Sequence, residues 1–165
     1  MMDFILPAWQ VIAIAAVGTV VVAVAGGVMT DTTGWYRTLR FPAWKPPDWA
    51  FGPIWTTILA LVALSAALSW EGASSSLGRT MIASLFVLNG LLNILWNYLF
   101  FLIRRPDLAM VEVAFLWLSI LALVVATYPI NRAASLMLLP YLVWVGIASA
   151  LNRSIVRMNG PFAGA

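Results

Sequence analysis

Long runs of apolar residues that contain no Asp, Glu, Lys or Arg divide the chain. The five runs are Phe4–Thr30, Trp49–Trp70, Thr80–Ile103, Val113–Asn131 and Ala133–Asn152. A helix needs roughly 20 apolar residues to cross a hydrocarbon core of about 30 Å, and each run comes close to that length or exceeds it. The apolar residues follow one another without the alternation of barrel strands, so the pattern predicts helices.

The predicted fold class is therefore all-α, an integral membrane bundle of five transmembrane helices in a single domain over residues 1–165. We expect the helices at about 5–29, 51–70, 80–103, 106–128 and 133–153. The first run has no basic residues before it and exceeds the usual apolar length of a signal peptide, which favours a membrane span. Composition agrees, because only 9% of the residues are charged, against about 25% in soluble domains.

Basic residues are distributed unevenly between the predicted connections. Seven fall on the side of the first connection and the C-terminus: Arg37, Arg40, Lys45, Arg104, Arg105, Arg153 and Arg157. Arg79 and Arg132 fall on the opposite side. The positive-inside rule then predicts a cytoplasmic first connection and C-terminus, with the N-terminus outside. The net charge of +3 is this topology signal, since no basic cluster indicates nucleic-acid binding.

The chain contains neither Cys nor His. Disulfides, thiolate catalysis and metal sites built from His or Cys are therefore excluded, as is haem held by an axial His or Cys. The sequence also has no P-loop, no GxGxxG and no GxSxG motif. We expect no metal site, no covalent cofactor and no conventional catalytic centre.

The first connection, residues 30–50, and the start of the next helix have an unusual composition. The stretch WYRTLRFPAWKPPDWAFGPIW begins at Trp35 and holds four of the nine tryptophans and four of the nine prolines. Prolines restrict their own backbone and the preceding residue, so we expect a bent, mostly non-helical path with Pro53 in the first turn of the second helix. Loops of this length in small domains are commonly lids or binding loops. An aromatic belt at the membrane interface is the alternative interpretation.

Two helices carry polar and aromatic residues at helical spacing. In the third helix the set is Asn89, Asn93, Trp96 and Asn97, and in the fifth it is Tyr141, Trp144, Ala148 and Asn152. This spacing places each set on one helix face. Asparagines that face lipid would lose hydrogen bonds at about 1–3 kcal/mol each, so the asparagine face is expected to point into the bundle. Hydrogen bonding between helices and the wall of a ligand pocket remain equal alternatives for it.

Two further features of the helices have a functional and a structural interpretation. Glu112 would lie about 10 Å into the fourth helix, at 1.5 Å per residue. An acid at that depth is a functional candidate, and pairing with a nearby arginine is the alternative. In the first helix, Ala15, Thr19, Ala23 and Gly27 recur every four residues. Such a small-residue face allows close helix packing or a dimer contact.

A lid rich in Trp and Pro above a bundle lined by Asn, Trp and Tyr favours one kind of ligand. It would be flat or rigid and largely apolar, with a few polar groups, because indole faces offer stacking area. Arg37, Arg40 and Lys45 are candidates to contact propionates or other carboxylates at the pocket mouth. A tetrapyrrole and a sterol both fit this description.

Three blocks of sequence carry a resemblance to a known family. The first is the P-x-W-x-P-P-x-W core from Pro42 to Trp49, followed by P-x-W ending at Trp55. The second is NILWNYLFF from Asn93, and the third is PYLVWVGIASALN from Pro140. With these blocks the chain resembles the translocator protein family, also called tryptophan-rich sensory proteins (TspO/MBR).

The resemblance implies a five-helix bundle whose pocket is closed by the first loop. Members bind porphyrins such as protoporphyrin IX and haem, and animal members also bind cholesterol. By this resemblance the candidate ligand-binding residues are Trp44, Trp49, Trp55, Asn89, Asn93, Trp96, Asn97, Glu112, Tyr141, Trp144 and Ala148. A homodimer in a bacterial membrane is expected by the same analogy.

The resemblance is incomplete at several positions, and two of them bear on ligand binding. Leu108 stands where members often have Trp, and Arg153 stands where the cholesterol-recognition segment of animal members needs Tyr. The favoured hypothesis is a receptor or carrier for porphyrins or similar flat apolar ligands, with a role in tetrapyrrole regulation, transport or stress sensing. One alternative is an enzyme-like, light-dependent degradation of porphyrin at Trp55, Trp96 and Trp144. Binding of sterols or other lipids, and a purely structural role, are the others.

Overall fold

Helices make up most of the chain in the computed structural model, which describes residues 7–162. In chain order they are α1 Ala8–Met29, α2 Gly34–Thr38, α3 Asp48–Gly72, α4 Ser76–Asn97, the π-helix η1 Tyr98–Leu102, α5 Pro106–Thr127, α6 Arg132–Met137 and α7 Leu139–Asn159. Within the described residues, five helical segments are long and apolar enough to cross a membrane: α1, α3, α4 with η1, α5, and α6 with α7. The predicted all-α membrane bundle of five helices is confirmed.

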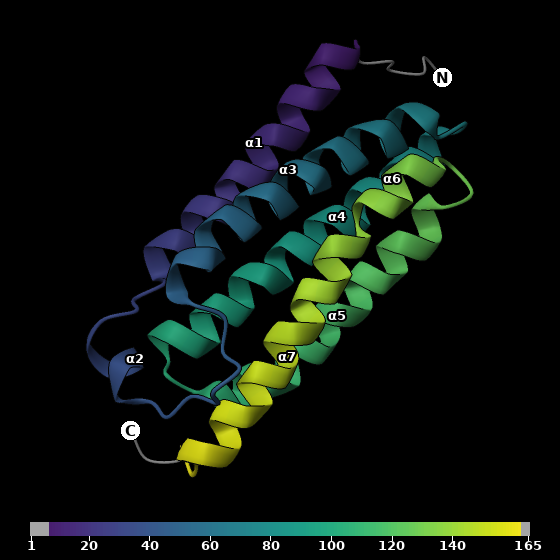
Figure 1. Cartoon of the computed structure of the whole chain (residues 1–165). Coiled ribbons are helices and arrows are strands. Elements are labelled where there is room, and N and C mark those ends of the chain that lie inside the picture. Colours follow the sequence, from purple (N-terminus) through teal and green to yellow (C-terminus); the bar gives the residue numbers. More distant parts are fainter. Residues whose placement is uncertain (1–6, 163–165) are drawn as a thin grey trace.

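The long helices run side by side along one axis, and α2 lies with its flanking loop at one end of them (Figure 1). The C-terminal end of α7 is at this same end, whereas α1 begins at the opposite end. The first loop and the C-terminal end of α7 therefore share a side of the bundle, as the distribution of basic residues predicts. Which membrane face that side occupies stays a prediction of the positive-inside rule.

Prolines set several helix boundaries, and one of them differs from expectation. The second span begins at Asp48, so Pro53 lies inside α3 and not in its first turn. The hydroxyl of Thr57 donates to the Pro53 carbonyl at 2.9 Å, one turn further on. The last span is divided at Leu138, because Pro140 at the start of α7 lacks an N–H and its ring cannot follow an uninterrupted helix.

The third span ends in a π-helical turn instead of a regular one. The extra residue per turn brings both Phe100 and Phe101 against Trp96, with ring centroids 5.0 and 6.2 Å away. The chain then reverses at Arg104, whose φ of 56° is in the left-handed region. The Arg105 N–H donates to the Leu99 carbonyl at 2.9 Å, which closes the turn into α5.

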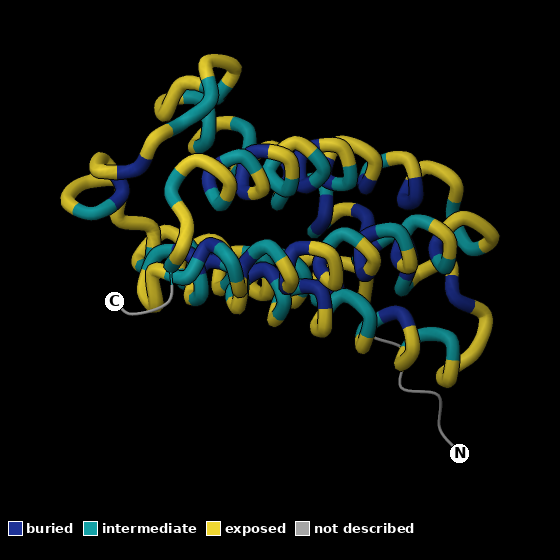
Figure 2. Tube along the Cα trace, turned by 90° about the horizontal axis from the view of Figure 1, so that it is seen from below, coloured by how far each residue is buried: buried dark blue, intermediate teal, exposed yellow. Residues whose placement is uncertain are grey.

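The core lies between α3, α5 and α7, and buried positions follow the inner sides of the helices in Figure 2. Its fully enclosed residues include Ile120, Leu123 and Val145. Aromatic pairs join α3 to α7, with Phe51 against Trp144 at 5.4 Å between ring centroids. The helix α1 packs on α3 and α4 and is peripheral, since Val11 is its one buried residue.

The small-residue face predicted for α1 is only partly the face that packs. Ala15 and Thr19 are half-buried, but Ala23 and Gly27 are exposed. A step of four residues turns about 400°, roughly 40° beyond a full turn, so a strict period of four rotates away from its neighbour. Gly26 takes the inner position instead, and a Cβ there would lie 3.4 Å from the Asn97 amide.

Candidate ligand-binding chamber beneath the first loop

A cavity of about 130 Å³ lies beneath the first loop, between the ends of α3, α4, α5 and α7. We call it the chamber. Six of the residues predicted as a ligand site line it: Trp55, Asn93, Trp96, Asn97, Trp144 and Ala148. The loop contributes Thr30 and Thr32 to the same cavity. The structure thus brings the two predicted stripes together beneath the first loop.

The asparagine stripe forms hydrogen bonds and also lines a cavity. Asn89, Asn93 and Asn97 are all buried. The Asn93 amide donates to the Tyr141 hydroxyl at 3.1 Å, and the Asn97 amide donates to the Asn93 carbonyl at 2.9 Å. The Thr30 hydroxyl donates to Asn97 Oδ1 at 3.4 Å. The two interpretations of this stripe are therefore combined at Asn93 and Asn97.

Two tryptophans that line the chamber have indole N–H groups without a hydrogen-bond partner among the described residues. The Nε1 atoms of Trp96 and Trp144 are buried and have no hydrogen-bond partner among the described residues. The two tryptophans belong to different helices and line the same cavity, although neither Nε1 atom is exposed to it in this closed structure. A buried donor left unpaired costs about 1–3 kcal/mol, so an acceptor atom placed beside either indole would recover that loss.

Sequence reasoning missed several residues that line the chamber, namely Tyr36, Asp48, Phe51 and Phe101. The spacing of four between Phe51 and Trp55 was a usable signal, because it places both rings on one face of α3. No signal marked Tyr36, which reaches the chamber only because α2 folds back over the bundle. Burial raises the pKa of Tyr36 above its usual value, against the opposing effect of the nearby Lys45.

Two predicted tryptophans lie outside the chamber. Trp44 is 51% exposed and Trp49 is 77% exposed, and neither lines the cavity. Both project from the loop side of the bundle, where the aromatic-belt interpretation places such residues. Trp44 and Trp49 are thus exposed, whereas Trp55, within α3, lines the chamber.

The three basic residues predicted to meet carboxylates do not line the chamber either. Arg37 is exposed on α2. The backbone of Arg40 is held by Asn159, whose side chain accepts from the Arg40 N–H at 2.7 Å and donates to its carbonyl at 2.9 Å. Lys45 pairs with Asp48 and lies 4.4 Å from the ring centroid of Phe41. These contacts fasten the loop to the ends of α3 and α7.

Glu112 is buried in α5, and both of its carboxylate oxygens lack a hydrogen-bond partner within residues 7–162. Arg105, one of the nearby arginines, is engaged elsewhere, because its Nε donates to Asp107 at 2.8 Å. Glu112 does not line the chamber, although the next residue, Val113, does. It is a buried acid beside the site and not a wall of it.

The remaining stripe residues are buried outside the chamber. Asn152 joins α7 to α5: its amide nitrogen donates to the Pro106 carbonyl and its oxygen accepts from the Met110 N–H, both at 3.1 Å. Tyr141 and Asn89 line a second, larger pocket together with Asn93, and the Asn89 amide also donates to Ser119 at 2.8 Å. Asn93 is therefore common to both cavities.

Comparison with known proteins agrees with this arrangement. A sequence model of the TspO/MBR family matches residues 11–158. The chain is 33% identical to a protein named tryptophan-rich protein TspO from Chlorobaculum tepidum, over 84% of this chain and 89% of that one. It is 34% identical to protein CrtK of Rhodobacter capsulatus, over 82% and 84%, and 29% identical to human translocator protein, over 79% and 78%. The resemblance seen in the three sequence blocks is confirmed, and the chain belongs to the TspO/MBR family.

Proposed function

We propose that this membrane protein is a receptor or carrier for a flat, largely apolar ligand of the porphyrin class, bound in the chamber beneath the first loop. Its relatives carry the names translocator protein and tryptophan-rich sensory protein, which support a membrane receptor-like role. The function would then be regulation, transport or stress sensing that depends on tetrapyrroles. Protoporphyrin IX and haem are the ligands that we would test.

The observation that carries this proposal is the pair of buried, unpartnered indole N–H groups of Trp96 and Trp144, two residues that line one chamber. A porphyrin offers two features that this lining can use. Its propionate oxygens can accept from the indoles, and its macrocycle can stack on aromatic rings such as Phe51 and Phe101. The indole N–H groups would then bind the carboxylates, which is the role predicted from the sequence for Arg37, Arg40 and Lys45.

The chamber is too small to hold a porphyrin while the first loop is closed. Its volume of about 130 Å³ is below the roughly 300–1,000 Å³ of typical ligand pockets. A porphyrin can therefore enter only if the first loop lifts, which makes the loop a lid in its closed position. The contacts that must open are those of Arg40 with Asn159 and of Lys45 with Asp48.

A titration of the purified protein with protoporphyrin IX in detergent, in the dark, tests the proposal. Saturable quenching of tryptophan fluorescence is expected, and Trp96→Phe and Trp144→Phe should each weaken binding. Trp117→Phe is the matched control, because Trp117 is half-buried in α5 but lines neither cavity. Equal affinity in all four proteins would contradict the proposal.

Light-dependent degradation of the bound porphyrin is a second candidate, favoured by the three tryptophans that line the chamber, Trp55, Trp96 and Trp144. Dioxygen would be the oxidant. The test is the loss of porphyrin absorbance under illumination in air. Loss that is faster with the protein than with a triple Trp→Phe variant, at equal porphyrin occupancy, would support this candidate, and equal rates would remove it.

Sterol binding, a homodimer, the cytoplasmic position of the C-terminus and a bacterial membrane stay predictions from the sequence. Arg153, which departs from the cholesterol-recognition segment, is exposed on α7. Nothing in the lining of the chamber favours a sterol over a porphyrin, whereas the two indole donors suit the two propionates.

A further inference from the structure

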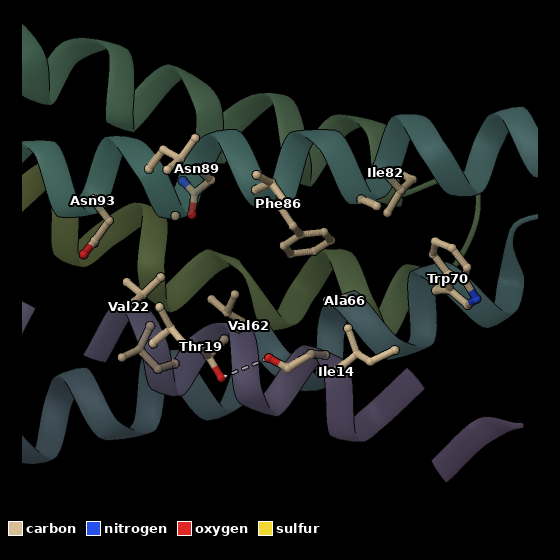
Figure 3. Close-up of a pocket in the computed structure, with 18 of the residues that line it drawn as sticks. Ile14, Thr19, Val22, Val62, Ala66, Trp70, Ile82, Phe86, Asn89 and Asn93 are labelled. Atoms are coloured by element: carbon tan, nitrogen blue, oxygen red, sulfur yellow. Dashed lines mark hydrogen bonds between the residues drawn. The ribbon is translucent and has the colours of Figure 1, made fainter. Parts of the chain in front are cut away.

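A pocket of about 430 Å³ lies between α1, α3 and α4, in the half of the bundle away from the first loop (Figure 3). Its walls are almost entirely hydrocarbon and aromatic, with Val62 and Ala66 from α3 and Ile82 and Phe86 from α4. From Ile82 to Asn93 the lining extends along α4 for about 16 Å at 1.5 Å per residue. The pocket is therefore long as well as apolar.

The mouth of this pocket opens sideways. The exposed members of its lining all belong to α1 and α4: Ile14, Gly18, Val21, Val87 and Leu91. They lie near the middle of two membrane-spanning helices. The mouth is thus continuous with the apolar outer surface of the bundle, at the depth of the hydrocarbon core. Whatever enters from there is drawn from the interior of the bilayer.

Three polar side chains of the pocket donate hydrogen bonds within the protein. The Thr19 hydroxyl donates to the Ala16 carbonyl at 3.0 Å. The amide nitrogens of Asn89 and Asn93 donate to Ser119 and Tyr141, respectively. The lining is otherwise almost wholly apolar, so the pocket does not suit an anionic or strongly polar ligand. Apolar cavities also stay dry, and unfilled walls lose dispersion contacts.

We propose that this pocket binds the terminal part of one acyl chain of a bilayer phospholipid. The chain enters between α1 and α4 and lies along Val62 and Phe86 toward the Asn93–Tyr141 pair, while the head group remains at the membrane interface. The long shape, the lateral mouth and the almost wholly apolar lining all fit a flexible hydrocarbon chain. The inference concerns a site separate from the chamber and does not rest on the porphyrin proposal.

Photolabelling of the full chain in vesicles of phosphatidylcholine tests this site. The probe is a phosphatidylcholine with a diazirine near the end of one acyl chain, and adducts are located by mass spectrometry. We expect adducts on Val62 and Ile82, which are buried within the bundle and line the pocket. Labelling of Val17 and Val125, which are exposed on the outside, provides the internal reference.

Variants that fill the pocket supply the decisive comparison. Ala66→Phe, and independently Ala83→Phe, should abolish labelling of Val62 and Ile82 and leave the external labelling intact, since both alanines line the pocket. Ala60→Phe is the matched control, because Ala60 is exposed on the same helix as Ala66. Helical circular dichroism and a single gel-filtration peak identify the folded variants.

Three results would overturn the inference. One is labelling confined to external positions such as Val17 and Val125. Another is labelling of Val62 and Ile82 that persists in both pocket-filling variants. The third is labelling of these two residues by a diazirine sterol but not by the acyl-chain probe, which would assign the pocket to a rigid ring system instead.

Discussion

The two cavities differ in size and in the chemistry of their linings. The pocket between α1, α3 and α4 is the larger, about 430 Å³ against about 130 Å³, and its lining is almost wholly apolar. The chamber is smaller and is closed by the first loop, and two of the tryptophans that line it have buried indole N–H groups without a hydrogen-bond partner among the described residues. The chemistry of the lining, and not volume, distinguishes a site for a specific polar-edged ligand from one that any hydrocarbon chain can fill.

Asn93 lines both cavities, and its hydrogen bond to Tyr141 lies between them. The two regions also differ in what bounds them. The chamber is closed by a loop that is fastened through Asn159 and Asp48, whereas the pocket is bounded by α1, the least buried of the long helices. Polar contacts at the end of the bundle thus hold the wall of one cavity, and helix packing holds the wall of the other.

Filling each cavity separately should produce the largest effects. If one variant lost both porphyrin binding and acyl-chain labelling, the two cavities would not be separate sites. Ala148→Phe is expected to abolish saturable porphyrin binding, because Ala148 lines the chamber, while acyl-chain labelling of Ile82 persists. Ala66→Phe should do the reverse. Porphyrin titration and photolabelling of the same preparations measure both. Ala150→Phe, at an exposed position of α7, is the control for Ala148→Phe.

Removing the shared residue should affect stability and both cavities. Asn93→Leu leaves the buried Tyr141 hydroxyl without its partner, and hydrogen bonds between membrane helices are worth about 0.6 kcal/mol, with a maximum near 1.7. The free energy of unfolding in a detergent titration is expected to fall by roughly this amount. Asn89→Leu should lower it similarly but leave porphyrin affinity unchanged, since Asn89 does not line the chamber. A porphyrin affinity that depends on Asn89 and not on Asn93 would contradict this division.

Loosening the lid should change rates more than affinity. Asn159→Ala removes two hydrogen bonds to the Arg40 backbone, and neutral hydrogen bonds contribute about 1 kcal/mol each, so porphyrin association should accelerate by about fivefold or more. Stopped-flow quenching measures the rate. Met158→Ala, beside it on α7 and partly exposed, should have no effect. An unchanged rate in Asn159→Ala would show that the first loop does not gate the chamber.

Exchange of the porphyrin metal should have the smallest effect. The chain has no His or Cys to bind iron axially, so haem and protoporphyrin IX should bind with Kd values within about threefold of each other. The haem spectrum should show no His- or Cys-ligated iron. Much tighter binding of haem would indicate an axial iron ligand other than His or Cys and would contradict this prediction.

The sequence predicted the spans well because charge is excluded from the hydrocarbon region almost without exception. It also placed Asn93, Asn97, Trp96 and Trp144 correctly on inner faces, since helical spacing decides that geometry. It did not locate the start of α3, because a proline such as Pro53 is typical of a first helical turn. In fact Asp48 occupies the first turn, where a carboxylate favours the helix dipole.

Other parts of the site depend on the path of the loop, which no periodicity describes. Trp44 and Trp55 stand in the same motif, but the first is half-exposed and the second lines the chamber. The fold-back of α2 brings Tyr36 against Phe41, which follows it closely in the chain, and against Phe101 from a distant segment. Glu112 has no hydrogen-bond partner among the described residues, while Arg105 pairs with Asp107 within its own turn.

The most direct measurement is the NMR signal of the indole N–H groups in ¹⁵N-tryptophan-labelled protein in micelles, before and after protoporphyrin IX is added in the dark. Trp96→Phe, Trp144→Phe and Trp117→Phe assign the three signals. The signals of Trp96 and Trp144 are expected to shift downfield as their N–H groups gain carboxylate acceptors, whereas the Trp117 signal should not shift. The dimethyl ester of the porphyrin should produce a smaller shift. Unshifted signals of Trp96 and Trp144 at a porphyrin concentration that saturates binding would contradict this prediction.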